Sequence, residues 1–190
     1  MTRVIAGSAG GRRLAVPPGA RTRPTSNRTR EGLFSAVESL RGSLVDARVL
    51  DLYAGTGAVG LESLSRGAAA ALLVEADPKA LRILRANARA LALPGARVVA
   101  AKVERVLAEP PAGPAYDVAF ADPPYALGEV ALEAMLRALA DFGWLAPDAV
   151  VVVERASRSA PVRWPAGLVG VRERRYGEST LWYGRPAPRT

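Results

Sequence analysis

Short apolar runs alternate with stretches of helical periodicity along most of the chain, and this alternation restricts the fold more than any other feature. The apolar runs contain the sequences VLDLY, AALLVE, RVVAA, DVAFA and AVVVVE, and the helical stretches between them are 57–66, 78–91, 103–108 and 129–140. Runs so uniformly apolar are typical of strands that are buried on both faces. The repeated order of strand and helix therefore predicts an α/β fold with a mostly parallel sheet covered by helices.

The two ends of the chain depart from this alternation. Residues 3–16 carry two short apolar stretches around Gly-Ser-Ala-Gly-Gly, a pattern typical of a β-hairpin. The proline-rich stretch PPGARTRPTSN predicts an extended linker, and Thr25, Ser26 or Asn27 could cap the helix that follows it. Near the C-terminus, LVGVRERRY and STLWYG are separated by Gly-Glu, which predicts an antiparallel hairpin added to the sheet edge.

The amino-acid composition excludes several classes of enzyme. The chain contains no Cys and no His, so it can form no disulfide, no thiolate or imidazole metal site and no Ser-His-Asp triad. Chemistry must come from carboxylates, Arg, the two Lys, hydroxyls, backbone groups or a cofactor, and we expect no metal. No apolar run approaches the roughly 18 residues of a membrane span, and the start MTRVIAG lacks the pattern of a signal peptide. We therefore expect a cytoplasmic protein with no membrane partner.

Positive charge is concentrated at the two ends. Residues 1–30 hold seven Arg and no acid, residues 31–154 hold eleven basic and sixteen acidic side chains, and residues 155–190 hold eight basic and two acidic ones. Arg clusters neutralise phosphates and bind them in a bidentate way, so this distribution favours contact with nucleic acid over a merely solvated basic face. The candidate phosphate contacts at the N-terminal end are Arg12, Arg13, Arg21 and Arg30.

A glycine-rich loop follows the first predicted parallel strand. The stretch DLYAGTGAVG places Gly55, Gly57 and Gly60 in the spacing G-x-G-x-x-G, and Glu75 ends the next strand. Glycines at these positions let the backbone turn tightly and approach a ligand, while an acid such as Glu75 accepts hydrogen bonds from ribose hydroxyls. Glycines that serve only as a tight turn between strand and helix are the plainer alternative.

Asp51, at the end of the first strand, distinguishes between two nucleotide cofactors. A dinucleotide site presents a helix N-terminus to a pyrophosphate, which a nearby carboxylate would repel. S-adenosylmethionine carries an ammonium and a sulfonium instead, so acids beside it are favourable. The order of Asp51 and the glycines therefore predicts S-adenosylmethionine as the cofactor.

The tetrapeptide Asp-Pro-Pro-Tyr follows the fourth predicted strand, at the edge where open α/β sheets bind ligands. The carboxylate of Asp122 and the carbonyl of Pro123 can each accept a hydrogen from an exocyclic amine, which directs the nitrogen lone pair toward a methyl donor. Consecutive prolines fix the main chain, and Tyr125 offers a face on which an unstacked base can lie. An ordinary turn that ends the strand is the alternative interpretation.

These motifs together resemble the RsmD-type methyltransferases, which methylate N2 of a guanine in 16S ribosomal RNA. The resemblance spans RVIAGSAGGRRL, RPTSNRTREGLF, LDLYAGTGAVGLESLSRGA, LLVEAD, DPPY, GWLAPDAVVVVE and YGESTLWY. It implies a Rossmann-like class I methyltransferase with a seven-stranded, mostly parallel sheet, an antiparallel last strand and an N-terminal β-hairpin extension. The corresponding division is 1–24, the hairpin and basic linker, and 25–190, the S-adenosylmethionine-dependent methyltransferase domain. Asp-Pro-Pro-Tyr alone is shared with DNA and protein amide methyltransferases.

The resemblance also implies roles for individual residues. Asp122, Pro123 and Tyr125 would bind the guanine amine, and Arg23 would lie near the donor pocket or the RNA. The expected cofactor contacts are Asp51, Tyr53, Ala54, Gly55 and Gly57 in the loop, Glu75 and Ala76 at the ribose, Val103 near the adenine, and Thr25 and Arg28 before and within the first helix. Two departures from the family pattern are Asn27, where Asp is usual, and Lys102, where an acid or Asn is usual beside the adenine.

The expected partner is 16S ribosomal RNA, either free or within a small ribosomal subunit or its assembly intermediate. One alternative function is methylation of adenine N6 or cytosine N4 in DNA, although the chain has no room for the target-recognition insertion that such enzymes usually carry. A second alternative is a non-catalytic RNA-binding module in which the basic ends make all the contacts.

Overall fold

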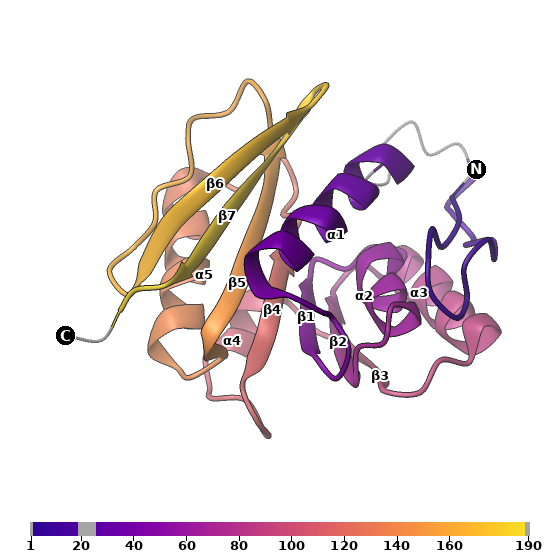
Figure 1. Ribbon diagram of the computed structural model, residues 1–190. Helices are drawn as coiled ribbons and strands as arrows, with labels where there is room; N and C mark the ends of the chain where they lie inside the picture. Colours follow the sequence, from indigo (N-terminus) through magenta and orange to yellow (C-terminus); the bar gives the residue numbers. More distant parts are fainter. Residues whose placement is uncertain (1, 19–25, 189–190) are drawn as a thin grey trace.

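The computed structural model describes residues 2–18 and 26–188 and contains a seven-stranded sheet in the order β3-β2-β1-β4-β5-β7-β6 (Figure 1). The strands are β1 Arg48–Leu52, β2 Ala70–Glu75, β3 Ala96–Ala100, β4 Tyr116–Ala121, β5 Leu145–Ala156, β6 Leu168–Tyr176 and β7 Ser179–Pro186. Strands β1 to β5 run parallel to one another, and β7 is antiparallel to both β5 and β6. The predicted seven-stranded, mostly parallel sheet is confirmed.

Helices cover both faces of this sheet. They are α1 Asn27–Arg41, α2 Ala58–Ser65, α3 Pro78–Leu91, α4 Val103–Leu107 and α5 Glu129–Asp141. Side chains alternate between the two faces along each strand, so Val150 and Val152 pack in the core under α1, α2 and α3, whereas Val151 and Val153 pack in the core under α4 and α5. Burial on both faces explains why these strands are apolar at every position.

The strand order reverses at β1, because the chain continues to β2 on one side of it and β4 lies on the other. At such a reversal the loops after the two strands diverge, which leaves space for a ligand at the carboxyl edge of the sheet. The glycine-rich loop follows β1, and Asp122 follows β4. The fold thus places the two main sequence motifs at the same edge.

The N-terminal segment, residues 2–18, folds back on itself but forms no regular strands. Its two arms pair in antiparallel fashion through a bridge between Arg3 and Arg13, with backbone hydrogen bonds from Val4 to Arg12 and from Leu14 to Thr2, both at 2.9 Å. The predicted hairpin is therefore present in short form. Val4 and Leu14 are buried in the same core as α2 and α3, and the hydroxyl of Ser65 on α2 donates to the carbonyl of Ala6 at 2.6 Å. The expected boundary at residue 24 lies outside the described residues.

Helix α1 crosses the face of the sheet near β5 and β1 (Figure 1). Of the three predicted capping residues, Ser26 acts as the N-cap, because its hydroxyl accepts a hydrogen bond from the backbone N–H of Thr29 at 3.1 Å. Leu33, Phe34 and Val37 are buried on the predicted apolar face. The first turn of α1 is therefore held at the carboxyl edge of the sheet.

The predicted C-terminal hairpin is confirmed in β6 and β7, which are joined at Gly177 and Glu178. Trp164 packs across it, since a Cβ at Gly170 or Gly184 would lie only 2.5 or 2.4 Å from the indole. Among the described residues, no helix has the length and apolar character needed to cross a membrane.

Candidate active site

Four carboxylate side chains lie on four adjacent strands at the carboxyl edge of the sheet. Glu75 ends β2, Asp51 lies on β1, Asp122 directly follows β4 and Glu154 lies on β5. Each acid comes two residues after an apolar strand residue that is buried in the core under α1, α2 and α3. In the same order as the acids, these apolar residues are Leu73, Val49, Phe120 and Val152. Because side chains alternate along a strand, the four acids share that face of the sheet. We call them the acidic row.

Asp51 is the most deeply buried member of the acidic row, with 1% of its surface exposed. One of its carboxylate oxygens accepts a hydrogen bond from the backbone N–H of Gly60 at 2.8 Å. Burial raises the pKa of Asp51 to about 7, the hydrogen bond from Gly60 opposes this rise, and the charge of Glu75 adds to it. A cation placed beside Asp51 would relieve the cost of ionising it.

The loop from Tyr53 to Gly57 has an unusual backbone. Tyr53, Gly55 and Gly57 all have positive φ angles, of 58°, 57° and 83°. A Cβ at Gly57 would lie 2.2 Å from a methyl carbon of Leu84, whereas a Cβ at Gly55 would meet nothing within 4 Å. Gly57 is therefore needed for packing, and Gly55 leaves open space at the turn, as a loop that approaches a ligand requires.

Glu75 holds this loop from the next strand. One carboxylate oxygen accepts from the backbone N–H of Gly55 at 2.8 Å, and the other accepts from the N–H groups of Ala76 and Asp77, both at 2.8 Å. A carboxylate has about four acceptor positions, so the oxygen that binds Gly55 can accept a further hydrogen bond. The position suits an acid that binds a ribose hydroxyl.

Asn87 on α3 connects the glycine-rich loop to the N-terminal segment. Its side-chain N–H group donates to the carbonyl of Thr56 at 2.9 Å and to that of Ala15 at 3.1 Å, and its oxygen accepts from the N–H of Ala15 at 2.8 Å. The side chain is buried, so these bonds are shielded from water. The loop and the N-terminal segment are thus fixed to each other through one amide.

A cavity of about 610 Å³ opens beside Asp122. Four parts of the chain line it: the first turn of α1, the Asp-Pro-Pro-Tyr stretch, Glu154 on β5 and the turn between β6 and β7. Its volume is in the range of pockets that hold small molecules or a single base. Tyr125 is 78% exposed, which leaves its ring free to stack on a base.

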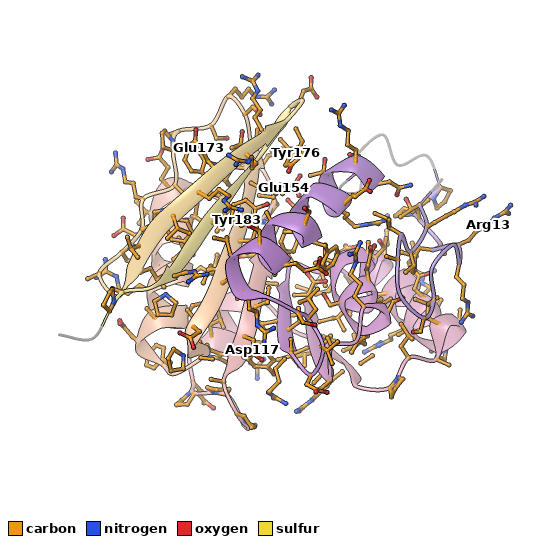
Figure 2. All side chains as sticks on the ribbon, in the orientation of Figure 1. Arg13, Asp117, Glu154, Glu173, Tyr176 and Tyr183 are labelled. Atoms are coloured by element: carbon orange, nitrogen blue, oxygen red, sulfur yellow. The ribbon has the colours of Figure 1, made fainter. Side chains whose placement is uncertain are left out.

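The electrostatic environment of Asp122 is strongly acidic. Burial raises the pKa of Asp122 well above its ordinary value, the charges of Glu154 and Asp51 raise it further, and Arg155 lowers it. A carboxyl with a raised pKa in a cavity is suited to accepting a proton near neutral pH. Figure 2 shows Glu154 on the side of the sheet crossed by α1, and Asp117 at the opposite end of the sheet.

The cavity brings together some predicted residues and not others. Arg28 lies in the cavity wall with Asp122, Pro123 and Tyr125. Val103 is buried at the start of α4, where Lys102 is the N-cap residue. Thr25, Arg21 and Arg23 lie outside the described residues, so their expected roles stay predictions.

The expectation that Arg30 contacts RNA phosphate is wrong. Arg30 is fully buried, with its Nε 3.2 Å from a carboxylate oxygen of Glu62 on α2. It also donates to the carbonyl of Arg3 and to the side chain of Asn27. The charge pattern alone could not distinguish this Arg from exposed ones. Arg28 and Arg30 lie in the same turn of α1, yet Arg28 is exposed and Arg30 faces the core.

Arg12 and Arg13 differ from each other in their surroundings. Both are exposed, but the guanidinium of Arg12 donates to the carbonyls of Ala90 and Leu91 at the C-terminal end of α3. A cation stabilises that end of a helix, so Arg12 has a structural partner already. Arg13 points away from the body (Figure 2). Their contact with RNA stays a prediction.

Sequence reasoning missed Glu154 and the turn from Arg175 to Ser179 as parts of the cavity. Glu154 could have been found by the rule that selected Asp51, Glu75 and Asp122, because it also ends a run of apolar strand residues. The turn could not have been found in this way, since its approach to Asp122 depends on the strand order.

Replacement of Asp51 by asparagine is expected to stabilise the folded protein in the absence of ligand. The pKa of Asp51 rises from 3.8 to about 7 on folding, so ionised Asp51 destabilises the folded state, weakly near pH 4 and fully above pH 7. The asparagine side chain would keep the bond from Gly60 without the charge. We expect a gain in unfolding free energy of about 2–4 kcal/mol at pH 8 that shrinks at pH 5.

Urea denaturation at both pH values measures this gain. Asp148→Asn is the control, because Asp148 is exposed near the start of β5, at the end of the sheet opposite to the acidic row. An equal gain for Asp51→Asn at pH 5 and pH 8 would contradict the assignment of a raised pKa to Asp51.

The sequence matches the protein family described as "Conserved hypothetical protein 95" over residues 2–185. It is 39% identical over 176 residues to "Ribosomal RNA small subunit methyltransferase D" of Escherichia coli strain K12, covering 93% of this chain and 85% of the relative. It is 31% identical over 177 residues to the protein of the same name from Haemophilus influenzae, covering 92% of this chain and 89% of the relative.

Solved structures agree with these sequence matches. The Escherichia coli protein yhhF superposes with a TM-score of 0.83 at 36% identity, with 97% of each chain covered. The rRNA methyltransferase aviRa from Streptomyces viridochromogenes has a TM-score of 0.67 at 19% identity over 90% of this chain and 88% of its own, which shows a shared fold. With a family match over nearly all its length, close relatives and a methyltransferase sheet, the chain belongs to the RsmD family of methyltransferases, the family that its motifs resemble.

Proposed function

We propose that this enzyme transfers a methyl group from S-adenosylmethionine to the exocyclic N2 amine of a guanine in 16S ribosomal RNA of the small subunit. The observation that carries the proposal is the acidic row beside a base-sized cavity at one edge of the sheet. The relatives named ribosomal RNA small subunit methyltransferase D support the choice of RNA over DNA.

The residues at the carboxyl ends of β1 and β2 and in the glycine-rich loop fit a cationic methyl donor. Glu75 at the N–H of Gly55 and Asp51 at the N–H of Gly60 place negative charge along the glycine-rich loop, where a sulfonium and an ammonium would be stabilised and a pyrophosphate repelled. Glu75 can accept a ribose hydroxyl, and the open space at Gly55 admits the ligand. When bound, S-adenosylmethionine supplies an electrophilic methyl group.

The residues after β4 activate the acceptor amine. The lone pair of an exocyclic amine is delocalised into the base, so the nitrogen is a poor nucleophile. Asp122 and the carbonyl of Pro123 accept its two hydrogens, which favours a lone pair directed at the methyl group. Methyl transfer would form the N–C bond as the methyl–sulfur bond of the donor breaks, which leaves a neutral thioether. The amine would lose a proton, and the raised pKa of Asp122 makes this carboxylate suited to take it. Tyr125 stacks on the base.

Basic side chains surround the opening through which RNA would enter. Arg28 on α1 and Arg175 at the end of β6 both line the cavity, and both are exposed. They are placed to bind the phosphates on either side of a base that has left its stack. Positive charge at both chain ends then provides the wider, sequence-independent attraction to RNA.

Incubation with labelled S-adenosylmethionine tests the proposal. The acceptors are small-subunit RNA, the assembled small subunit and duplex DNA, and mass spectrometry of nuclease digests locates the label. We expect N2-methylguanine in one of the two RNA samples and none in DNA. Labelled adenine or cytosine in DNA, or no labelled product with any acceptor, would overturn the proposal.

A further inference from the structure

The cavity beside Asp122 contains a second carboxylate, Glu154, to which the chemistry described so far gives no contact with the base. Ala121 on β4 pairs with Val153 on β5, so Asp122 and Glu154 follow at the same level on neighbouring strands. Both residues line the cavity of about 610 Å³, and Glu154 is only 8% exposed. Two acids therefore face the same space.

The strand order gives the two acids different positions relative to the methyl donor. The glycine-rich loop follows β1, and the order β1-β4-β5 places Asp122 between that loop and Glu154. A base that presents its amine to Asp122 can therefore direct the ring atom next to that amine toward Glu154, on the side away from the donor. Adjacent strands are roughly 4.8 Å apart, so both carboxylates are within reach of one edge of a base.

The neighbouring ring atom differs between guanine and the other bases with an exocyclic amine. In guanine the N2 amine is flanked by N1, which carries a hydrogen and donates, and by N3, which accepts, so only the N1 side offers a donor to a carboxylate. In adenine and cytosine the ring nitrogen beside the amine carries a lone pair and accepts. An ionised carboxylate only accepts, so it binds the guanine edge with a charge-assisted hydrogen bond and repels the other two.

We propose that Glu154 determines the specificity for guanine by accepting a hydrogen bond from N1–H while Asp122 accepts one from the N2 amine. This inference rests on the proposed function and adds a residue that reads the identity of the base. Asp-Pro-Pro-Tyr alone could bind any exocyclic amine. In this proposal, the preference for guanine over the other bases comes from Glu154 on β5.

A test replaces the target guanosine by 2-aminopurine riboside, which keeps the exocyclic amine but has an unprotonated N1. The probe is small-subunit RNA ligated from fragments, with guanosine or 2-aminopurine at the mapped position. We expect wild-type enzyme to prefer guanosine by about 10²-fold or more, because the carboxylate repels the bare N1. In Glu154→Gln the side-chain amide can donate to that N1, so the preference should fall at least about tenfold.

The ratio of the two rates is measured within one preparation of each enzyme, so partial misfolding of a variant cancels. Loss of the O6 atom in 2-aminopurine affects wild type and variant alike and cancels too. Glu173→Gln is the matched control, since Glu173 is exposed on β6 outside the cavity (Figure 2) and should keep the wild-type preference.

The outcomes separate this inference from the proposed function. If wild-type enzyme methylates no guanine, the proposed function fails. If it methylates guanine and Glu154→Gln keeps the wild-type preference over 2-aminopurine, only the role of Glu154 is refuted.

Discussion

Replacement of Asp122 by alanine is expected to slow methyl transfer by about 10²–10⁴-fold and to leave the affinity for RNA nearly unchanged. In the proposed mechanism, alanine removes both the acceptor of an amine hydrogen and the group that takes the proton. In the proposed function the phosphate contacts come from Arg side chains elsewhere, so we expect binding of RNA to persist. Single-turnover rates with labelled donor measure the first quantity, and filter binding measures the second.

Asp148→Ala is the matched control for this experiment. Asp148 is an exposed acid on the same strand as Glu154, and it lies in a separate groove at the other end of β5. Its variant should transfer methyl groups at the wild-type rate. An undiminished rate in Asp122→Ala would refute the catalytic assignment, and a parallel loss of RNA affinity would point to a role in binding.

Replacement of Glu62 by leucine is expected to lower the free energy of unfolding by about 3–5 kcal/mol. Arg30 and Glu62 are both fully buried, 3.2 Å apart, and Glu62 also accepts from Arg66 at 2.9 and 3.0 Å. Burial lowers the pKa of Arg30, and the charge of Glu62 opposes this shift. Without Glu62, the guanidinium of Arg30 would stay buried with an uncompensated charge. Urea denaturation followed by tryptophan fluorescence measures the loss.

A double-mutant cycle separates the ion pair from simple packing. In Arg30→Met with Glu62→Leu, apolar side chains replace both charges, so most of the stability should return. Glu133→Gln is the surface control, because the pair of Glu133 with Arg137 is largely solvated and should contribute less than about 1 kcal/mol. A double variant that is less stable than Glu62→Leu alone would contradict the expectation.

The sheet and its helices could be predicted from the sequence because hydrophobic periodicity is a local property. The helix expected over 129–140 is α5, Glu129–Asp141, and the strand expected at AALLVE is β2. The N-terminal hairpin is present, but its pairing is shorter than its apolar stretches suggest. Residues 3–16 have the apolar stretches of two strands, but Val4 and Leu14 are used to pack against α2 and α3, and only one bridge forms.

The positions of two parts of the candidate site could be predicted from the sequence, because each follows directly from a local motif. The loop at Gly55 and the tetrapeptide at Asp122 each lie at the end of a strand, and position along the chain is sufficient to find them. The contribution of Glu154 depends on β5 lying beside β4, and that of the turn after Tyr176 depends on β7 entering between β5 and β6. Such pairings are long-range, so no local pattern contains them.

The side chain of Asn87 has a consequence for anyone who wishes to redesign this enzyme. Deleting the first fifteen residues would strip that amide of two of its three hydrogen bonds, leaving its oxygen without the N–H of Ala15 and its nitrogen bonded only to the carbonyl of Thr56. A shortened version would therefore need a substitute for Asn87 before its catalytic efficiency could be compared with that of the parent. Chimeras that exchange the N-terminal segment between homologues should therefore exchange α3 together with it.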